Sequence, residues 1–252
     1  MSILVINAGS SSLKFGVFDD NAAARLGSGE IDWARGDRQQ AQLAVRPTNG
    51  ATVRSRLSVL DNASAAACAI QAALGLIRPG CKRSPITAVG HRVVHGGSEF
   101  RTSMLIDEGV KAAIARLSDL APLHNPPALK AIEVAETILA GKPQVAVFDT
   151  AFFAPFPPKA YLYGVPYAWY QDWGIRRFGF HGISHQYCAG RAAEILRCDP
   201  AGLRIINCHL GGGCSAAAIR GNVAVASTMG FTPLDGLMMA TRPGAVDPGI
   251  FP

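Results

Sequence analysis

The chain has 252 residues, of which 49% are hydrophobic and 17% charged. This balance excludes a disordered chain and a charged solenoid, and the length allows one large domain or two smaller ones. The net charge of +6 comes from scattered Lys and Arg residues with no basic run, which argues against nucleic acid as a partner. No apolar run reaches membrane-spanning length, so we expect a soluble, cytoplasmic protein with no membrane partner.

The cysteines predict a reducing environment. No CxxC pair occurs among them, and several lie in apolar runs. We therefore expect reduced, buried core thiols rather than disulfides or a metal site. The six are Cys68, Cys81, Cys188, Cys198, Cys208 and Cys214.

Two distant segments share one plan. Within residues 3–18, two apolar runs flank the turn NAGSSS at 7–12, and within residues 203–219 two runs flank the turn HLGGG at 209–213. Each predicts strand, tight turn, strand. Taken alone, either turn is as readily an ordinary hairpin turn as a phosphate-binding one. Their recurrence favours two domains of like topology whose turns present backbone N–H groups to phosphate. Neither turn matches the phosphate-binding motif GxxxxGK[ST].

The segment between these hairpins predicts helices and a buried strand. Asp107 is expected to cap one helix, and Asn125 a second that ends at Gly141. A buried strand at 144–148 then delivers Asp149 at its C-terminal end, where ligands bind in α/β sheets. Alternating helices and buried strands indicate the mixed α/β class.

A proline-containing stretch at 152–164 is the predicted domain junction. It divides the chain into an N-terminal domain at 1–151 and the start of a C-terminal nucleotide-binding domain at 152–252.

Two arginines lie in glycine-flanked settings. Arg92 belongs to GHRVVHGG at 90–97, and Arg242 to ATRPG at 240–244. A buried arginine must be paired, so a structural salt bridge is one interpretation. Guanidinium also matches carboxylate and phosphate geometry, and two such settings in one chain favour an anion clamp.

Other polar residues leave their interpretation open. Asp149 could hold Mg²⁺, accept a proton or simply cap a helix. His181 and His185 in FGFHGISH have the spacing of a zinc pair, but the intervening glycine and the lack of a third ligand argue against zinc. Donation to an anion is the better interpretation for His181, and for His124 ahead of its helix. A satisfied core histidine remains the alternative for both.

Together the motifs resemble one family. LVINAGSSSLK at 4–14 and the segment at 205–215 are similar to the two acetate kinase signatures, with GHRVVHGG, APLHNPPAL, FDTAF, FGFHGISH and TMGFTPLDGLMMATRPG between and beyond them in the family's order. The resemblance spans nearly the whole chain. It implies an α/β fold of duplicated actin-like ATPase (ribonuclease H-like) domains, the second one truncated. It also implies a homodimer, and Mg²⁺ (or Mn²⁺) with ATP or ADP between the domains.

The resemblance also implies roles for individual residues. Arg92 and Arg242 would hold the carboxylate and the phosphoryl group, His181 would donate to the equatorial oxygens, and Asp149 would assist with metal or orientation. Asn7 would lie at the metal. The expected phosphate-binding residues are Ser10, Ser12, Lys14, His209, Leu210, Gly211, Gly212 and Gly213. The expected walls of the substrate pocket are Arg92, Val94, Leu123, Phe180 and Pro233.

The implied activity is acetate kinase: in-line phosphoryl transfer from ATP to acetate, giving acetyl phosphate and ADP. Val94 favours acetate over propionate, although one methylene carries only ~1–3 kcal/mol, so a propionate or short-chain carboxylate kinase is the alternative. Gly212 departs from the asparagine of many relatives. We expect the family to continue past Pro252, so a catalytically incomplete anion-binding fragment is a second alternative. A sugar or protein kinase of the same superfold fits less well, and a structural protein least.

Overall fold

The computed structural model describes residues 1–21, 24–33, 38–77 and 85–250. Their contacts divide the chain into two compact units. The first comprises Met1–Val93 and Ser103–Val147, and the second Val94–Thr102 and Phe148–Pro252. The domain boundary predicted after residue 151 stays a prediction.

The first unit is built on an eight-stranded sheet in the order β5-β4-β3-β2-β1-β6-β8-β7. The strands are β1 Ser2–Ala8, β2 Ser12–Asp19, β3 Arg25–Asp32, β4 Ala41–Pro47, β5 Val53–Leu57, β6 Ile86–Val93, β7 Met104–Leu105 and β8 Gln144–Phe148. Strands β1 to β5 pair antiparallel in sequence order, whereas β6 runs parallel to β1. The predicted first hairpin and the buried strand at 144–148 are confirmed. The first turn is shorter than the predicted 7–12, because Asn7 and Ala8 extend β1 by pairing with Lys14 and Leu13 of β2.

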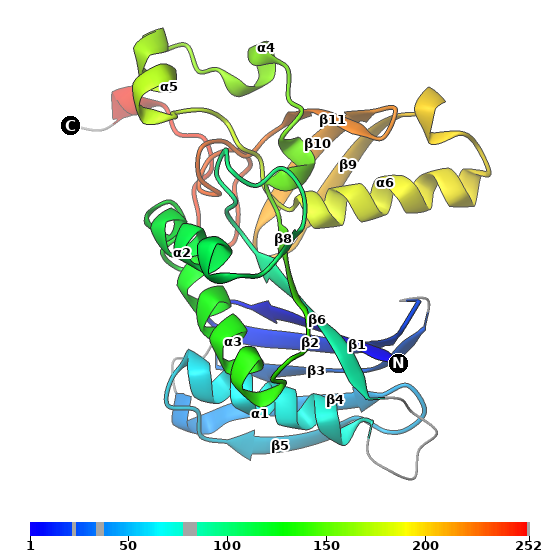
Figure 1. The fold of residues 1–252 in the computed structure, drawn as a ribbon. Coiled ribbons are helices and arrows are strands. Elements are labelled where there is room, and N and C mark those ends of the chain that lie inside the picture. The colour runs from blue at the N-terminus through cyan, green and yellow to red at the C-terminus, as the bar shows by residue number, and fades with distance from the viewer. Residues whose placement is uncertain (22–23, 34–37, 78–84, 251–252) are drawn as a thin grey trace. The chain divides into compact units, whose positions relative to one another are not determined.

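Helices α1 and α3 cover one face of this sheet (Figure 1). The helical elements are α1 Asn62–Gly75, α2 Glu108–Arg116 and α3 Asn125–Ile138, with 3₁₀ turns η1 Arg38–Gln40 and η2 Leu117–Asp119. Apolar side chains of the sheet, including Leu4, Ile6 and Leu13, are buried against the alanine-rich faces of these helices. Small residues there allow close approach of helix to sheet, and this apolar core holds β1 and β6 in place.

The helix starts test two predicted caps. The Asp107 carboxylate accepts a hydrogen bond from the Val110 amide at 2.8 Å, as predicted. The prediction for Asn125 is wrong by one residue, because the helix already begins at Asn125 and His124 occupies the cap position without a side-chain cap bond. The next two positions are Pro126 and Pro127. Neither proline has an N–H for a capping side chain to accept, so the fixed φ of proline starts this helix instead.

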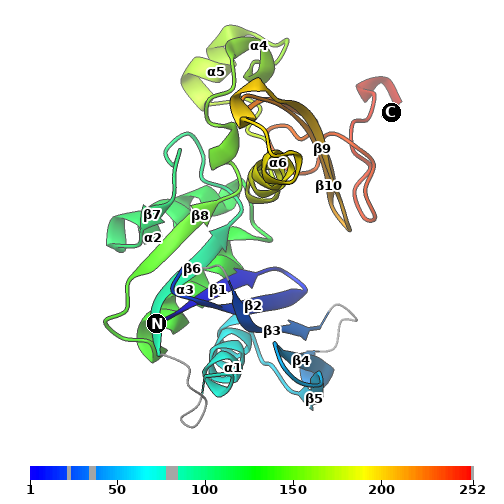
Figure 2. The ribbon, with the colours of Figure 1, turned by 90° about the vertical axis from the view of Figure 1, so that its right-hand side faces the viewer.

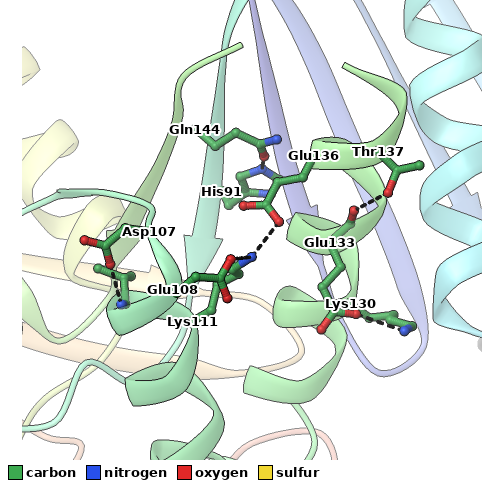
Figure 3. Close-up of polar contacts among 10 residues, drawn as sticks. His91, Asp107, Glu108, Lys111, Lys130, Glu133, Glu136, Thr137 and Gln144 are labelled. Carbon is green, nitrogen blue, oxygen red and sulfur yellow. Dashed lines mark hydrogen bonds and ion pairs between the residues drawn. The ribbon is translucent and has the colours of Figure 1, made fainter. Parts of the chain in front are cut away.

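Polar contacts tie the helices and strands of the first unit together (Figure 3). The Lys111 ammonium on α2 lies 2.6 Å from the Glu108 carboxylate and 2.8 Å from that of Glu136 on α3, and both hydrogen bonds raise the lysine pKa. His91 on β6 contacts the Gln144 amide oxygen on β8 at 2.6 Å. Burial lowers the His91 pKa to about 4, so this imidazole is neutral and its Nε2–H donates to Gln144.

The second unit contains a three-stranded antiparallel sheet in the order β11-β10-β9, with α6 packed beside β9 (Figure 2). Its elements are η3 Ala151–Phe153, α4 Pro158–Tyr161, α5 Tyr167–Trp173, α6 Gly182–Leu196, η4 Pro200–Gly202, β9 Arg204–Leu210, β10 Cys214–Arg220, β11 Val223–Ser227 and η5 Pro248–Ile250. The second predicted hairpin is confirmed, but its turn is shorter than predicted. His209 and Leu210 extend β9 because they pair with Ser215 and Cys214 of β10, which leaves only residues 211–213 in the turn.

The cysteines are free thiols, as predicted, at every described position; Cys81 lies outside the described residues. The expectation that they are buried is wrong, since Cys188, Cys198 and Cys208 are exposed. Cys208 shows why, because it alternates along β9 with the half-buried Asn207 and His209 and therefore points to the opposite, exposed face. Within the described ranges, no helix has the length and apolar character needed to cross a membrane.

Candidate active site

The first predicted phosphate turn occupies only residues 9–11 of the first unit and is held by hydrogen bonds to its main-chain atoms. The Gly9 amide donates to the Ser12 carbonyl at 2.9 Å. Trp33, just after β3, donates its backbone N–H to the Ser11 carbonyl and its indole N–H to the Ser10 carbonyl, each at 3.0 Å. None of these bonds uses a serine hydroxyl. The turn is thus fixed in shape while Ser10 and Ser12 keep hydroxyl groups to offer a ligand.

Arg92 and Asn7 come together beside this turn. Strand β6 is the parallel neighbour of β1, with His91 in register with Ile6, so Arg92 lies next to the end of β1. Its Nη1 donates to the Asn7 amide oxygen at 3.0 Å. This bond fixes the asparagine oxygen and holds a guanidinium group, a strong hydrogen-bond donor to anions, beside the turn.

Lys14 and Leu123, also in the first unit, have different surroundings, with Lys14 directly across from Asn7 in the β1–β2 register. The Lys14 ammonium is 3.3 Å from the Glu30 carboxylate, its direct partner across β2 and β3. An exposed ion pair of this kind is worth at most about 1 kcal/mol and exchanges readily. Leu123 is 64% exposed, so within its own unit it is not the buried pocket wall that the resemblance implies.

In the second unit, Asp149 anchors the start of α6. The residue is buried, and its carbonyl accepts a hydrogen bond from the Gly182 amide at 3.0 Å. A Cβ atom on Gly182 would collide with that carbonyl oxygen, so the glycine in FGFHGISH is required for this close approach. The contact places His181, the N-cap residue of α6 with a left-handed φ of 59°, near Asp149.

A network of imidazole rings surrounds the start of α6. The His181 and His209 rings stack with centroids 4.1 Å apart. His181 Nδ1 lies 2.9 Å from the Ser215 hydroxyl, which also lies 2.8 Å from His185 Nε2. His209 is oriented by Ser184, whose hydroxyl is 2.9 Å from its Nδ1. The Ser215 contact at Nδ1 and the stacking on His209 fix the orientation of the His181 ring.

The glycine turn, His181 and Arg242 converge on one place. A Cβ atom built on Gly213 would lie 3.5 Å from His181 Nε2 and 3.6 Å from Arg242 Nη1. The Gly212 carbonyl accepts from the Ala240 amide at 3.2 Å, which ties the turn to the segment carrying Arg242. A bare backbone turn, an imidazole and a guanidinium are all hydrogen-bond donors to anions, so this part of the second unit suits phosphate oxygens.

The remaining predicted residues of the second unit have other surroundings. Val94 and Phe180 are buried in one apolar cluster with Phe178 and Met229. Pro233 contributes its carbonyl, which accepts from Arg242 Nη1 at 2.9 Å and so orients that guanidinium. Leu210 is 77% exposed on the outward face of β9, where only its backbone can serve the turn.

The oxygen donors of each unit fit a metal that keeps few protein ligands. Asp149 supplies a buried carboxylate and Asn7 an amide oxygen. Over the described parts of the chain, no three His, Cys, Asp or Glu side chains are grouped as a metal site. Mg²⁺ typically takes one or two protein oxygens together with substrate phosphates and water. The donor set therefore suits Mg²⁺ carried by a nucleotide rather than zinc held by the protein alone.

Sequence reasoning missed the residues that orient these groups. Ser184, Asn207 and Ser215 lie within the quoted motifs and Trp33 lies outside them, but each acts through a contact with a distant segment that no motif shows. Ser215 could have been found from the hairpin, because it lies directly across from His209 in the β9–β10 register.

The strand order β3-β2-β1-β6-β8 around an initial hairpin, followed by a second hairpin with its own glycine turn, defines an α/β chain of the actin-like (ribonuclease H-like) ATPase class. The model of the acetokinase family matches residues 2–252, so the chain belongs to the acetokinase family. Both the predicted resemblance and the predicted fold class are confirmed.

Relatives support the assignment to the family. The chain is 46% identical to the acetate kinase of Cyanothece sp. (strain PCC 7425 / ATCC 29141) over 99% of the chain and 62% of the relative. It is 49% identical to that of Nostoc sp. (strain PCC 7120 / SAG 25.82 / UTEX 2576) over 99% of the chain and 63% of the relative. The chain thus spans less than two thirds of the length of these relatives.

Solved structures give the same picture. A crystal structure of Porphyromonas gingivalis acetate kinase is 38% identical with a TM-score of 0.84, over 99% of this chain and 62% of that one. A propionate kinase from Francisella tularensis subsp. tularensis SCHU S4 is 35% identical with a TM-score of 0.87, at the same coverage.

Proposed function

We propose that the chain forms part of an acetate kinase, which transfers a phosphoryl group from ATP to acetate and gives acetyl phosphate and ADP. The observation that carries the proposal is the convergence of Gly213, His181 and Arg242 in the second unit. Phosphoryl transfer needs positioning and charge neutralisation more than covalent catalysis. A cluster of cationic and neutral donors supplies both to a group whose charge is spread over three oxygens.

In this mechanism the second unit holds the transferred group. Arg242, oriented by the Pro233 carbonyl, neutralises charge on the phosphoryl oxygens, and His181 donates to one of them. The backbone of residues 211–213 and the adjacent His209 hold the nucleotide phosphates. Mg²⁺ or Mn²⁺, bound with the nucleotide, would offset phosphate charge, and Asp149 is the carboxylate available to orient it.

The first unit supplies the acceptor side. Arg92 pairs with the carboxylate of acetate, while Asn7, whose oxygen Arg92 orients, offers that oxygen toward the metal. Ser10, Ser12 and Lys14 bind phosphate. For the methyl group, the proposed contacts are Leu123 in this unit and, in the second unit, Val94, Phe180 and Pro233.

A short-chain carboxylate such as propionate is the second candidate substrate. It is favoured by the likeness to the propionate kinase structure, whereas the buried Val94 side chain favours acetate. The proposal includes a cytoplasmic homodimer.

The test measures acetate-dependent ADP and acetyl phosphate formation by the purified protein, with its intact mass determined. Arg242→Ala should lower kcat by about 10²-fold or more, the usual effect of removing a group that stabilises transition-state charge. Arg220→Ala, an exposed arginine at the end of β10, is the matched control and should leave kcat unchanged. ATP turnover that does not depend on acetate, or near-normal turnover of Arg242→Ala, would overturn the proposal.

A further inference from the structure

We propose that Asn207, His185 and Ser215 form a directed hydrogen-bond chain that holds His181 as the tautomer with its proton on Nε2. These are positioning residues, since each acts through His181 and none reaches the proposed phosphate site itself. The inference rests on the proposed function only for the identity of the anion that this proton meets.

The hydrogen-bond chain consists of three consecutive contacts. Asn207 Nδ2 lies 2.7 Å from His185 Nδ1. His185 Nε2 lies 2.8 Å from the Ser215 hydroxyl, and that hydroxyl lies 2.9 Å from His181 Nδ1. The contacts link β9, α6 and β10, so they depend on the packing of the helix against the hairpin. His185 and Ser215 are fully buried, which removes water as a competing partner.

The direction of the chain follows from what each group can donate. An amide nitrogen can only donate, so His185 Nδ1 must accept the bond from Asn207. Burial lowers the pKa of His185 to about 4, so the ring is neutral near pH 7 and carries one proton. With Nδ1 accepting, that proton lies on Nε2, and His185 donates to Ser215.

The Ser215 hydroxyl determines which nitrogen of His181 carries the proton. Its hydroxyl has one proton, and over the described residues its side chain has only the two imidazole nitrogens as partners. Because it accepts from His185, it donates to His181 Nδ1. The proton of a neutral His181 is therefore on Nε2, the nitrogen nearest to the Gly213 turn.

This arrangement decides whether His181 attracts or repels an anion. An Nε2–H group donates to a phosphoryl oxygen, whereas the other tautomer would present a lone pair to it. Reversing the first link of the chain should reverse every later link. The hydrogen-bond chain thus makes the neutral His181 Nε2–H group a donor before any ligand binds.

Asn207→Asp is the sharpest test, because it keeps the side-chain shape and removes the donor. At pH 8 the carboxylate only accepts, so neutral His185 must carry its proton on Nδ1, Ser215 must donate to His185, and His181 must carry its proton on Nδ1. Asn222→Asp, on the exposed β10–β11 turn, makes the same change in charge as a control. Nitrogen-15 NMR of histidine-labelled protein reports the tautomer directly.

We expect His181 to be protonated on Nε2 in the wild type and in Asn222→Asp, and on Nδ1 in Asn207→Asp. Ser215→Ala, which breaks both imidazole contacts, should give a mixture of His181 tautomers, and it replaces the first variant if that one does not fold. A wild-type His181 protonated on Nδ1 would overturn the proposal, as would an unchanged tautomer in the folded variants.

The same spectra separate this inference from the proposed function. Adding acetyl phosphate should shift the His181 Nε2 signal of the wild type and not that of Asn207→Asp. If the tautomers are as expected but acetyl phosphate shifts neither signal, the directed chain stands and the assigned anion fails. If the wild-type signal shifts while the tautomer is the reverse of the one expected, the directed chain fails and the anion site stands.

Discussion

The two hairpin turns share a sequence plan but are built differently. The first, at residues 9–11, is fixed by the backbone and indole N–H groups of Trp33 and by the Gly9 amide, which donates to the Ser12 carbonyl, and it offers its own hydroxyl groups. The second, at residues 211–213, has no side chains and gains its chemistry from His181 and Arg242, which come from segments outside the hairpin. The second turn therefore depends on the packing of α6, and the first largely on its own sheet.

The largest effect should come from breaking the anchor of α6. In Gly182→Ala the new methyl group would collide with the Asp149 carbonyl oxygen, and because that atom is backbone the helix start must shift. We expect the free energy of unfolding to fall by at least about 3 kcal/mol, as for other severe overpacking. Urea denaturation followed by circular dichroism measures it.

Gly190→Ala is the matched control within the same helix. Nothing lies within 4 Å of a Cβ atom at Gly190, so this variant should be more stable than wild type by about 0.5–1 kcal/mol, the helix preference for alanine over glycine. A loss below 1 kcal/mol in Gly182→Ala would show that the second turn does not depend on this anchor.

A smaller effect is expected from pH, and it concerns a histidine of the first unit. His91 has its Nε2 bonded to Gln144, while its buried Nδ1 has no partner within the described residues. Burial lowers the pKa of His91 from its ordinary value of 6.5 to about 4 in the folded protein. As the pH falls, the unfolded chain therefore binds a proton at a higher pH than the folded chain does. Its contribution to stability is complete above pH 6.5 and lost as the pH falls toward 4.

Between pH 7.5 and pH 5.0, His91 should account for about 2 kcal/mol of lost stability. His91→Gln, which has no titrating group, should show a correspondingly weaker pH dependence in urea unfolding at these two pH values. An unchanged dependence would mean that folding does not lower the pKa of His91. His185 is also buried but has partners on both ring nitrogens. Comparing the pH dependence of stability due to His91 with that due to His185 therefore separates the effect of burial from the effect of hydrogen bonding.

Local patterns predicted both hairpins but placed too many residues in each turn, because the flanking residues pair within the strands. The alternation of apolar residues in 3–18 and the position of Asp107 depend on neighbours in sequence, so the first hairpin and that helix cap followed from them. The Asn125 cap failed because the two following prolines lack donors, and the exposed cysteines failed because strand alternation, not apolar surroundings, decides which face a residue takes. The Ser215 contacts require the packing of α6 against β9 and β10, which no local pattern contains.

The smallest effect on stability should come from Gly212→Asn, which gives the second turn a polar side chain as in the first turn. Nothing lies within 4 Å of a Cβ atom at Gly212, and its φ is not in the left-handed region, so Gly212→Asn should change stability by less than about 0.5 kcal/mol. The new amide adds one donor at the proposed phosphate site. One hydrogen bond is worth about 0.5–1.5 kcal/mol, so ADP should bind about 2- to 10-fold more tightly by calorimetry. Gly212→Ala adds the Cβ atom without the amide and should bind ADP as the wild type does; equal affinities of the two variants would mean that the turn binds through its backbone alone.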